Sequence, residues 1–341
     1  MQPFQDQIDQ KSLDSPANSH PKATNSPSFS PFLANKFSVE AGDSGFLFGS
    51  VCYSSRHNMI IACPLNDTMQ FYDATTFLPI KERETQRLDD SVMQISFDPE
   101  TDTYIMGSPK GYIYMYNAST NELKKLKRCD SQVMTAIFMN SACYAYSESG
   151  SKEVFLGTLG NENVVSSGPQ NNNSFFLQRL SQGNLLLSGS ADGSMAIYRT
   201  DKLPRLPIFC SFRAHQDRMF MLTAQRIVIG QKEYVVTASQ DQTVKVWHLL
   251  KGRMRLLRVI CCEEIPVSLV YLENYKMLAI ALGSESVKFV RLLSGKLEST
   301  ISWSEDNTRC LFFMKERNMI GVTSYDHSSI ELIQLGGVKG G

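Results

Sequence analysis

The chain has 341 residues, and its 34 Lys and Arg residues balance its 34 Asp and Glu residues, so the formal net charge is zero. This balance argues against generic nucleic-acid binding and against general attraction of acidic substrates, because both require excess positive charge. No apolar run approaches the ~18 residues that a membrane-spanning helix requires, and the eight cysteines lack the two-residue spacing of zinc or redox motifs.

Residues 1–35 are rich in Ser, Pro, Asn and Gln, which predicts a disordered tail. The N-terminus lacks the cationic start and apolar stretch of a signal peptide, and its acidic residues are unusual for a mitochondrial transit peptide. We therefore expect a cytoplasmic or nuclear protein with free thiols. Ser15, Ser26 and Ser30 each precede a proline, a pattern of proline-directed phosphorylation sites that is also common in disordered tails.

Residues 36–337 contain short apolar runs separated by turn residues, which is typical of an all-β array. Seven segments repeat a frame in which a turn precedes a strand that ends on a large apolar residue. The frame residues are Tyr72, Tyr116, Phe155, Tyr198, Trp247, Val290 and Leu332. Their mean spacing of about 43 residues falls in the ~40–45-residue range of propeller blades. The sequence thus predicts a seven-bladed β-propeller of four-stranded antiparallel blades.

The charged segments 81–87, 121–128 and 251–259 follow frame residues, and we expect them in outermost strands, where charges protect a free edge from association. After Leu332 the seventh blade lacks such a strand, whereas the strand-like segment 36–41 precedes the first blade. We expect this N-terminal strand to complete the last blade and close the ring. Residues 338–341 are expected to form a short flexible C-terminus.

The fifth repeat carries polar residues in a specific order. These are His215 before the first strand, Thr237 in the second, Asp241 in the next turn and Trp247 in the third. A carboxylate that orients an imidazole, linked through a hydroxyl to an indole N–H, would satisfy polar groups that are costly to bury. This repeat resembles a WD repeat, and the chain as a whole resembles a divergent WD-repeat β-propeller. The resemblance implies a structural tetrad rather than an acid–base pair.

No enzymatic motif is present: the sequence has no glycine-rich phosphate loop, paired-His metal motif or Gly-x-Ser-x-Gly elbow. We therefore expect no catalytic residue, cofactor or metal. The vicinal Cys261 and Cys262 should point to opposite faces of a strand and pack there. The basic residues of 251–258 can be interpreted in two ways: they protect a strand edge, or they bind phosphoinositide or an acidic partner.

We expect a noncatalytic scaffold that binds protein or peptide partners as a subunit of a larger assembly, because a closed ring presents many loops on a rigid frame. His215 and Asp241 can meet only if their loops share one end of the ring. The candidate partner-binding residues are those of such loops that the tetrad does not use: Lys110, Arg218, Gln240, Glu285 and Tyr325. Two alternatives remain, a membrane-surface propeller that binds phosphoinositides through the basic edge, and a less favoured propeller enzyme.

Overall fold

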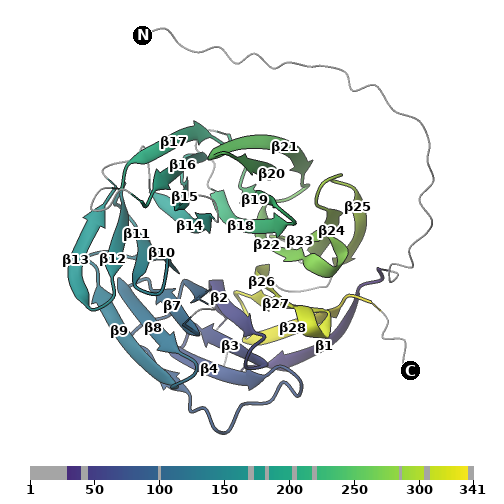
Figure 1. Cartoon of the computed structure of the whole chain (residues 1–341). Coiled ribbons are helices and arrows are strands. Elements are labelled where there is room, and N and C mark those ends of the chain that lie inside the picture. Colours follow the sequence, from purple (N-terminus) through teal and green to yellow (C-terminus); the bar gives the residue numbers. More distant parts are fainter. Residues whose placement is uncertain are drawn as a thin grey trace, which may run out of the picture.

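Seven four-stranded antiparallel sheets surround a central axis like the blades of a propeller (Figure 1). The structure is a computed structural model, and it describes residues 29–39, 45–98, 101–167, 173–180, 184–201, 206–216, 221–283, 286–302 and 308–336. Within these ranges all secondary structure is β-strand apart from two single-turn 3₁₀ helices. The predicted seven-bladed propeller is therefore confirmed.

The first four blades follow one another in chain order. Their strands are β2 (Phe46–Ser54), β3 (Met59–Pro64), β4 (Thr68–Asp73) and β5 (Gln86–Arg87) in blade 1; β6 (Gln94–Asp98), β7 (Thr103–Gly107), β8 (Tyr112–Asn117) and β9 (Glu122–Arg128) in blade 2; β10 (Val133–Phe138), β11 (Cys143–Glu148), β12 (Val154–Thr158) and β13 (Asn161–Ser166) in blade 3; and β14 (Ser174–Leu180), β15 (Leu185–Ser190), β16 (Ser194–Arg199) and β17 (Ile208–Arg213) in blade 4.

The last three blades contain the two 3₁₀ helices and the closing strand. Their elements are β18 (Met221–Ile229), β19 (Lys232–Ser239), β20 (Thr243–Leu250) and β21 (Arg253–Cys261) in blade 5; β22 (Pro266–Leu272), η1 (Glu273–Tyr275), β23 (Met277–Leu282), β24 (Ser286–Arg291) and β25 (Leu297–Ser302) in blade 6; and β26 (Thr308–Met314), η2 (Lys315–Arg317), β27 (Met319–Ser324), β28 (Ser329–Gln334) and β1 (Phe32–Ser38) in blade 7.

The second strand of each blade forms the core. Every residue of β3, β15 and β23 is buried, because each sheet is covered on both faces by its neighbours. Their apolar sequences therefore do not alternate with polar residues. Outer strands such as β9 and β21 are mostly exposed and carry the expected charged segments. Residues 81–87 differ, because only Gln86 and Arg87 form a strand there.

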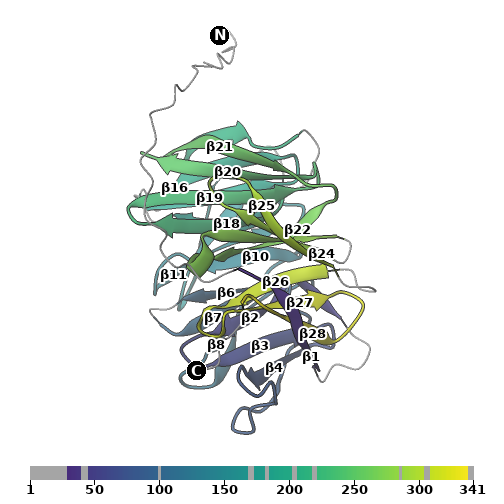
Figure 2. The ribbon, with the colours of Figure 1, turned by 90° about the vertical axis from the view of Figure 1, so that its right-hand side faces the viewer.

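The ring closes as predicted, with β1 antiparallel to β28 as the outer strand of blade 7. In both views β1, in purple, lies beside β28, in yellow (Figures 1 and 2). Lys36 stands opposite Glu331, and its Nζ lies 3.5 Å from Oε1 of that residue. The ring of Phe37 packs on Tyr72 and Phe77 of blade 1. The N-terminal strand thus joins the last blade to the first.

The predicted end of the tail at residue 35 is wrong by a few residues, because β1 already begins at Phe32. Phe32 pairs with Gln334 at the far end of β28, so the whole outer edge of β28 is covered. Residues 32–34 are Phe, Leu and Ala, but the average composition of residues 1–35 hid this short apolar run. Residues 1–28 and 337–341, where the rest of the tail and the C-terminal segment were predicted, lie outside the described residues.

Candidate partner-binding face and the His215 network

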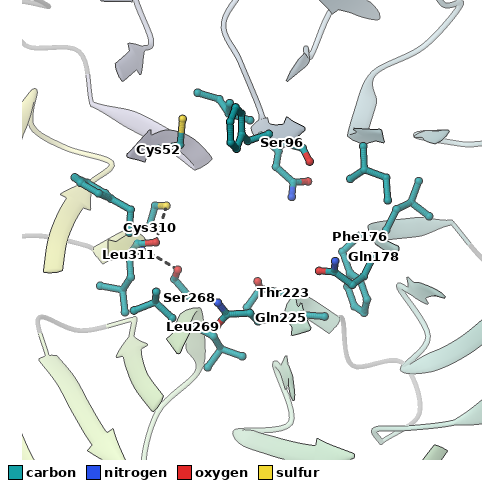
Figure 3. Close-up of a pocket in the computed structure, with 18 of the residues that line it drawn as sticks. Cys52, Ser96, Phe176, Gln178, Thr223, Gln225, Ser268, Leu269, Cys310 and Leu311 are labelled. Carbon is teal, nitrogen blue, oxygen red and sulfur yellow. Dashed lines mark hydrogen bonds between the residues drawn. The ribbon is translucent and has the colours of Figure 1, made fainter. Parts of the chain in front are cut away.

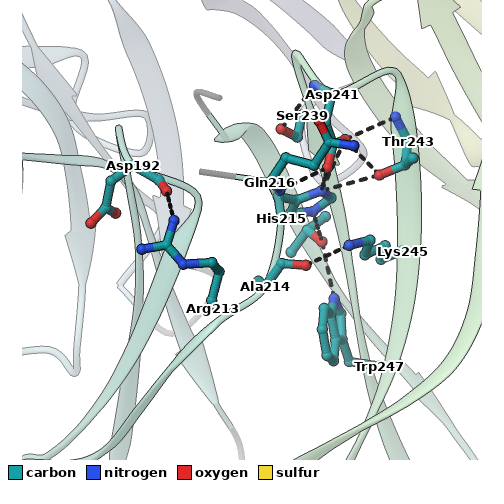
Figure 4. A network of polar contacts seen from close by, with 11 residues as sticks. Asp192, Arg213, Ala214, His215, Gln216, Ser239, Asp241, Thr243, Lys245 and Trp247 are labelled. Carbon is teal, nitrogen blue, oxygen red and sulfur yellow. Dashed lines mark hydrogen bonds and ion pairs between the residues drawn. The ribbon is translucent and has the colours of Figure 1, made fainter. Parts of the chain in front are cut away.

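The four residues of the predicted tetrad are joined by hydrogen bonds in blade 5 (Figure 4). Nδ1 of His215 lies 3.0 Å from Oδ2 of Asp241, and Nε2 lies 2.8 Å from Oγ1 of Thr237. Trp247 donates its indole N–H to the same Thr237 oxygen at 3.0 Å. Asp241 also accepts a hydrogen bond from the backbone N–H of Gln216. The network links the loop entering the blade to its second and third strands.

The protonation states of the network follow from its burial. Burial lowers the pKa of His215 to about 4, although the Asp241 carboxylate opposes this shift. Burial disfavours the Asp241 carboxylate, but hydrogen bonds from Thr243 and from the Gln216 N–H outweigh it, and the net effect lowers the pKa of Asp241. At neutral pH the neutral imidazole therefore donates from Nδ1 to the carboxylate and accepts from the Thr237 hydroxyl at Nε2.

This arrangement leaves His215 unable to act on a substrate. Its side chain is 0% exposed and that of Asp241 is 1% exposed, and both ring nitrogens are already hydrogen-bonded. A general base must come within hydrogen-bond reach of the proton that it removes. The geometry is that of a structural clamp.

The loops that enter the blades and the turns between second and third strands lie at one end of the ring, which we call the His215 face. Blades other than blade 5 join these loops by different bonds. In blade 1 the N–H of Leu65 donates to the Gly45 carbonyl at 3.0 Å, and in blade 6 the N–H of Gly283 donates to the Ile265 carbonyl at 2.9 Å.

Lys110 takes part in a contact that holds blade 2 together, whereas the sequence suggested that its only role is to bind a partner. In blade 2 the acid Asp90 lies in the loop that enters the blade, and the base Lys110 lies in the turn between the second and third strands. The backbone N–H of Lys110 donates to Oδ2 of Asp90 at 2.5 Å, and its Nζ lies 3.5 Å from Oδ1. Asp90 is buried, so the pair serves blade 2 as the His215–Asp241 pair serves blade 5. The Lys110 side chain nevertheless remains 62% exposed.

Tyr325 lies on the His215 face in the turn between β27 and β28 and is 44% exposed. The guanidinium of Arg309 lies 4.8 Å from the centroid of its ring. Gly45 packs against the same turn so closely that a Cβ there would lie 1.6 Å from the Tyr325 carbonyl oxygen. The position of Tyr325 is therefore set by backbone packing. Two other candidates, Arg218 and Glu285, lie outside the described residues.

A central channel of about 980 Å³ runs between the first strands of all seven blades (Figure 3). Gln240, in the turn after β19, also lines the channel, so the channel reaches the His215 face. Its wall combines apolar and uncharged polar side chains, among them Cys52, Ser96, Phe176, Gln178, Thr223, Gln225, Ser268, Leu269 and Cys310. Four charged residues also line it, namely Asp98, Arg179, Arg226 and Arg309. Sequence reasoning did not identify this channel, although apolar and polar residues alternate in β18, as at Thr223, Ala224 and Gln225.

The channel wall offers little for catalysis. Among its described residues Asp98 is the only carboxylate, and none is a histidine. Burial, with smaller contributions from the Cys63 and Cys310 thiols, raises the pKa of Cys52 well above its ordinary value, so this thiol stays protonated. Across the described ranges, no three His, Cys, Asp or Glu side chains gather to hold a metal ion.

A second surface lies on the outer strand of blade 5, which we call the blade 5 edge (residues 250–259). Residues 243–262 contain five basic residues and no acidic residue. Leu250, Leu256 and Val259 are 54%, 43% and 43% exposed. The strand register places Leu250 on the same face of the sheet as Arg253 and Arg255, and Leu256 and Val259 on the opposite face.

The charges of the blade 5 edge differ from those of the other basic outer strand, β9. There Lys125 pairs with Asp89, and Lys124 pairs with Glu122. On β21, no described acidic side chain forms an ion pair with Arg253 or Arg255. Protection of a strand edge therefore explains β9 better than it explains β21.

These features define a closed seven-bladed propeller in which one blade carries the hydrogen-bonded His–Thr–Asp–Trp set. The family model "WD domain, G-beta repeat" matches residues 210–248, which include all four residues of the set. The match shows that this segment is similar to a WD repeat, and the fold around it is a seven-bladed β-propeller. In blades 1, 2 and 6 other hydrogen bonds join the entering loop to the turn between the second and third strands.

Two further comparisons bear on the fold. The chain is similar to the β-propeller domain of Cps50 (Swd1) from Myceliophteria thermophila, with a TM-score of 0.74 and 11% sequence identity over 87% of this chain and 99% of that one. At this identity the similarity shows the fold alone. The comparison with curated proteins finds no match. In the described part of the chain no helix is long and apolar enough to cross a membrane.

Proposed function

We propose that the protein is a noncatalytic scaffold that binds protein or peptide partners on its His215 face, as a subunit of a larger assembly. One observation carries the proposal. The channel mouth, the Gln240 turn and the exposed Tyr325 with the half-buried Arg309 beside it share the face on which hydrogen bonds hold the loops of blade 5. A loop that is already held by such hydrogen bonds loses little conformational entropy when a partner binds.

The chemistry of this face suits a protein or peptide partner. Tyr and Arg are the residue types most enriched among the energetic anchors of interfaces. The Tyr325 ring is partly exposed while its backbone is held by Gly45. The polar groups most suited to proton transfer, His215 and Asp241, are buried away from the surface. These points favour a binding site over a catalytic one.

Location in the cytoplasm or nucleus is part of the proposal. All eight cysteines are free thiols in the structure. Several of them lie buried among apolar side chains, for example Cys63 and Cys262. Proteins of reducing compartments keep cysteines in this state.

The proposal is tested by affinity capture from a lysate followed by mass spectrometry. The face variant combines Tyr325→Ser with Gln240→Arg, and the matched control combines Arg253→Glu with Arg255→Glu on the blade 5 edge. Unfolding midpoints first establish that both variants are folded. We expect the face variant to lose partners that the wild type and the edge variant retain. Loss of partners only with the edge variant contradicts the assignment to the His215 face.

The blade 5 edge supports a second candidate function, binding to an anionic membrane surface that contains phosphoinositide. Lys251, Arg253 and Arg255 match the charge of such a surface. Leu250 is exposed on the same sheet face as the two arginines and matches the apolar boundary of a membrane. Each basic residue near an anionic surface contributes about 1 kcal/mol at low salt. The absence of nearby acidic residues in 243–262 is the specific observation in its favour.

Liposome co-sedimentation tests this candidate, with vesicles of phosphatidylcholine alone or with added phosphatidylserine and phosphoinositide. We expect binding only to anionic vesicles and a strong decrease with salt. Arg253→Glu with Arg255→Glu should abolish binding, whereas Lys124→Glu with Lys125→Glu on β9 should not. Equal binding of both variants, or binding to neutral vesicles, rejects the candidate.

A further inference from the structure

The segment that precedes β1 is anchored on blade 6 by Phe29. The Phe29 ring lies edge-on to Tyr275, with ring centroids 5.0 Å apart, and edge-on to Phe289, with centroids 5.1 Å apart. Tyr275 belongs to η1 and Phe289 to β24, both in blade 6. Because β1 itself belongs to blade 7, the N-terminal segment crosses the seam between the last two blades.

The receiving site is built into the ring. The hydroxyl of Tyr275 donates to the Leu335 carbonyl at 2.9 Å and accepts from Nδ2 of Asn318 at 2.6 Å. Phe289 is fully buried, and Phe29 packs against the apolar cluster that fills the blade 6–7 interface. Phe29 is thus held by groups whose positions are fixed by both blades.

Ser30 lies between two fixed points. It is exposed and precedes Pro31, Phe29 is anchored on one side, and Phe32 pairs with Gln334 on the other. In phosphoryl transfer the attacking hydroxyl must align with the γ-phosphate inside the kinase cleft. Only two residues separate Phe29 from Phe32, so Ser30 can enter a cleft only if one of these contacts first opens.

We propose that Ser30 is a phosphorylation site for a proline-directed kinase and that docking of Phe29 controls its availability. The γ-phosphoryl group passes from ATP to Oγ of Ser30, ADP leaves, and the hydroxyl proton passes to the kinase base. Ser15 and Ser26, the other serines that precede proline, lie outside the described residues.

The first test measures the rate of phosphorylation at each serine when the full chain is treated with a purified proline-directed serine kinase and Mg-ATP. Phe29→Ala should raise the rate at Ser30 about tenfold, because two aromatic contacts are lost, while the rates at Ser15 and Ser26 stay unchanged. Phe32→Ala is the matched control, because this ring is 50% exposed and also neighbours Ser30. Equal Ser30 rates in all three proteins, or no Ser30 phosphorylation in Phe29→Ala, overturn the proposal.

The second test checks that Phe29 holds the segment, by the rate of tryptic cleavage after Lys36, which lies within β1. Phe29→Ala should be cleaved several times faster than the wild type, because the segment before β1 loses its anchor on blade 6. An unchanged cleavage rate in Phe29→Ala would show that the ring does not hold the segment and overturns the proposal.

Discussion

Trp247 and His215 do not touch directly but share the hydroxyl of Thr237, which lies 3.0 Å from the indole nitrogen and 2.8 Å from Nε2 of the imidazole. The hydroxyl has one proton, which it donates to the imidazole, and its lone pairs accept the indole N–H. Asp241 fixes the imidazole from the other side. Removal of any member therefore leaves a buried polar group without its partner.

Trp247→Ala should lower the free energy of unfolding by ~3–5 kcal/mol, because a large aromatic side chain is lost from the blade 4–5 interface. His215→Ala and Asp241→Ala should each cost ~1–3 kcal/mol by leaving partners unsatisfied. Urea denaturation gives these values. In a double-mutant cycle the His215 and Asp241 effects should not add. Simple additivity would show that the two residues do not form one network.

The same network should make the protein less stable in mild acid. Burial lowers the pKa of His215 to about 4, against about 6.5 in an unfolded chain. Between these pH values the unfolded state binds more protons than the folded state, so stability falls as the pH falls through this window. The lowered pKa of Asp241 acts in the same direction at still lower pH. Urea midpoints measured from pH 7 to pH 4 should fall less in His215→Gln than in the wild type. An identical pH profile in the two proteins contradicts this prediction.

The ring closure predicts a graded response to truncation. Deletion of residues 1–28 should leave the thermal midpoint unchanged, because β1 and the Phe29 anchor remain. Deletion of residues 1–35 removes the pairs of Phe32, Leu33 and Asn35 and should lower the midpoint. Deletion through Asp43 exposes the entire outer edge of β28 and should lower it further. Equal midpoints for all three proteins would exclude a stabilising role for the N-terminal strand.

Arg83, which precedes the two-residue outer strand β5, links blade 1 to blade 2. Its guanidinium donates to the Tyr116 hydroxyl at 2.5 Å and to the Ala118 carbonyl at 2.8 Å, both in blade 2. Arg83→Ala should therefore cost about 1–3 kcal/mol in unfolding free energy. Arg87→Ala, at an exposed position in β5, is the control and should have little effect. Similar losses in both variants would show that Arg83 does not connect the two blades.

Features that depend on the repeat period and on local residue patterns, such as the number of blades, could be predicted from the sequence. Features that depend on contacts between distant segments of the chain could not. The spacing of frame residues such as Tyr72 and Trp247 was enough for the number of blades. The start of β1 was missed because the average composition of residues 1–35 hid the short apolar run Phe32, Leu33 and Ala34. The Lys110–Asp90 pair reverses the order of acid and base found in blade 5, so a search for the His–Asp pattern does not find it. The Phe29 anchor joins residues far apart in the chain and leaves no local signal.

Gly45 provides a way to move Tyr325 without changing it. A Cβ at position 45 would lie 1.6 Å from the Tyr325 carbonyl oxygen and 2.2 Å from its carbonyl carbon. These are backbone atoms, so neither a rotamer change nor a small shift can relieve the clash. Gly45→Ala must therefore displace the turn between β27 and β28, and overpacking of this kind typically costs ~1–3 kcal/mol.

Gly283→Ala is the matched control for this prediction. Gly283 also belongs to a turn on the His215 face, but a Cβ there would meet its nearest neighbour, the Ile265 carbonyl oxygen, at an ordinary 3.6 Å. Gly45→Ala should lower both the unfolding midpoint and the capture of partners that depend on Tyr325, while Gly283→Ala should change neither. If Gly45→Ala lowers the midpoint but captures those partners as well as the wild type does, the Tyr325 turn is not part of the binding site. The blade 5 edge then becomes the better candidate, because its contacts are independent of this turn.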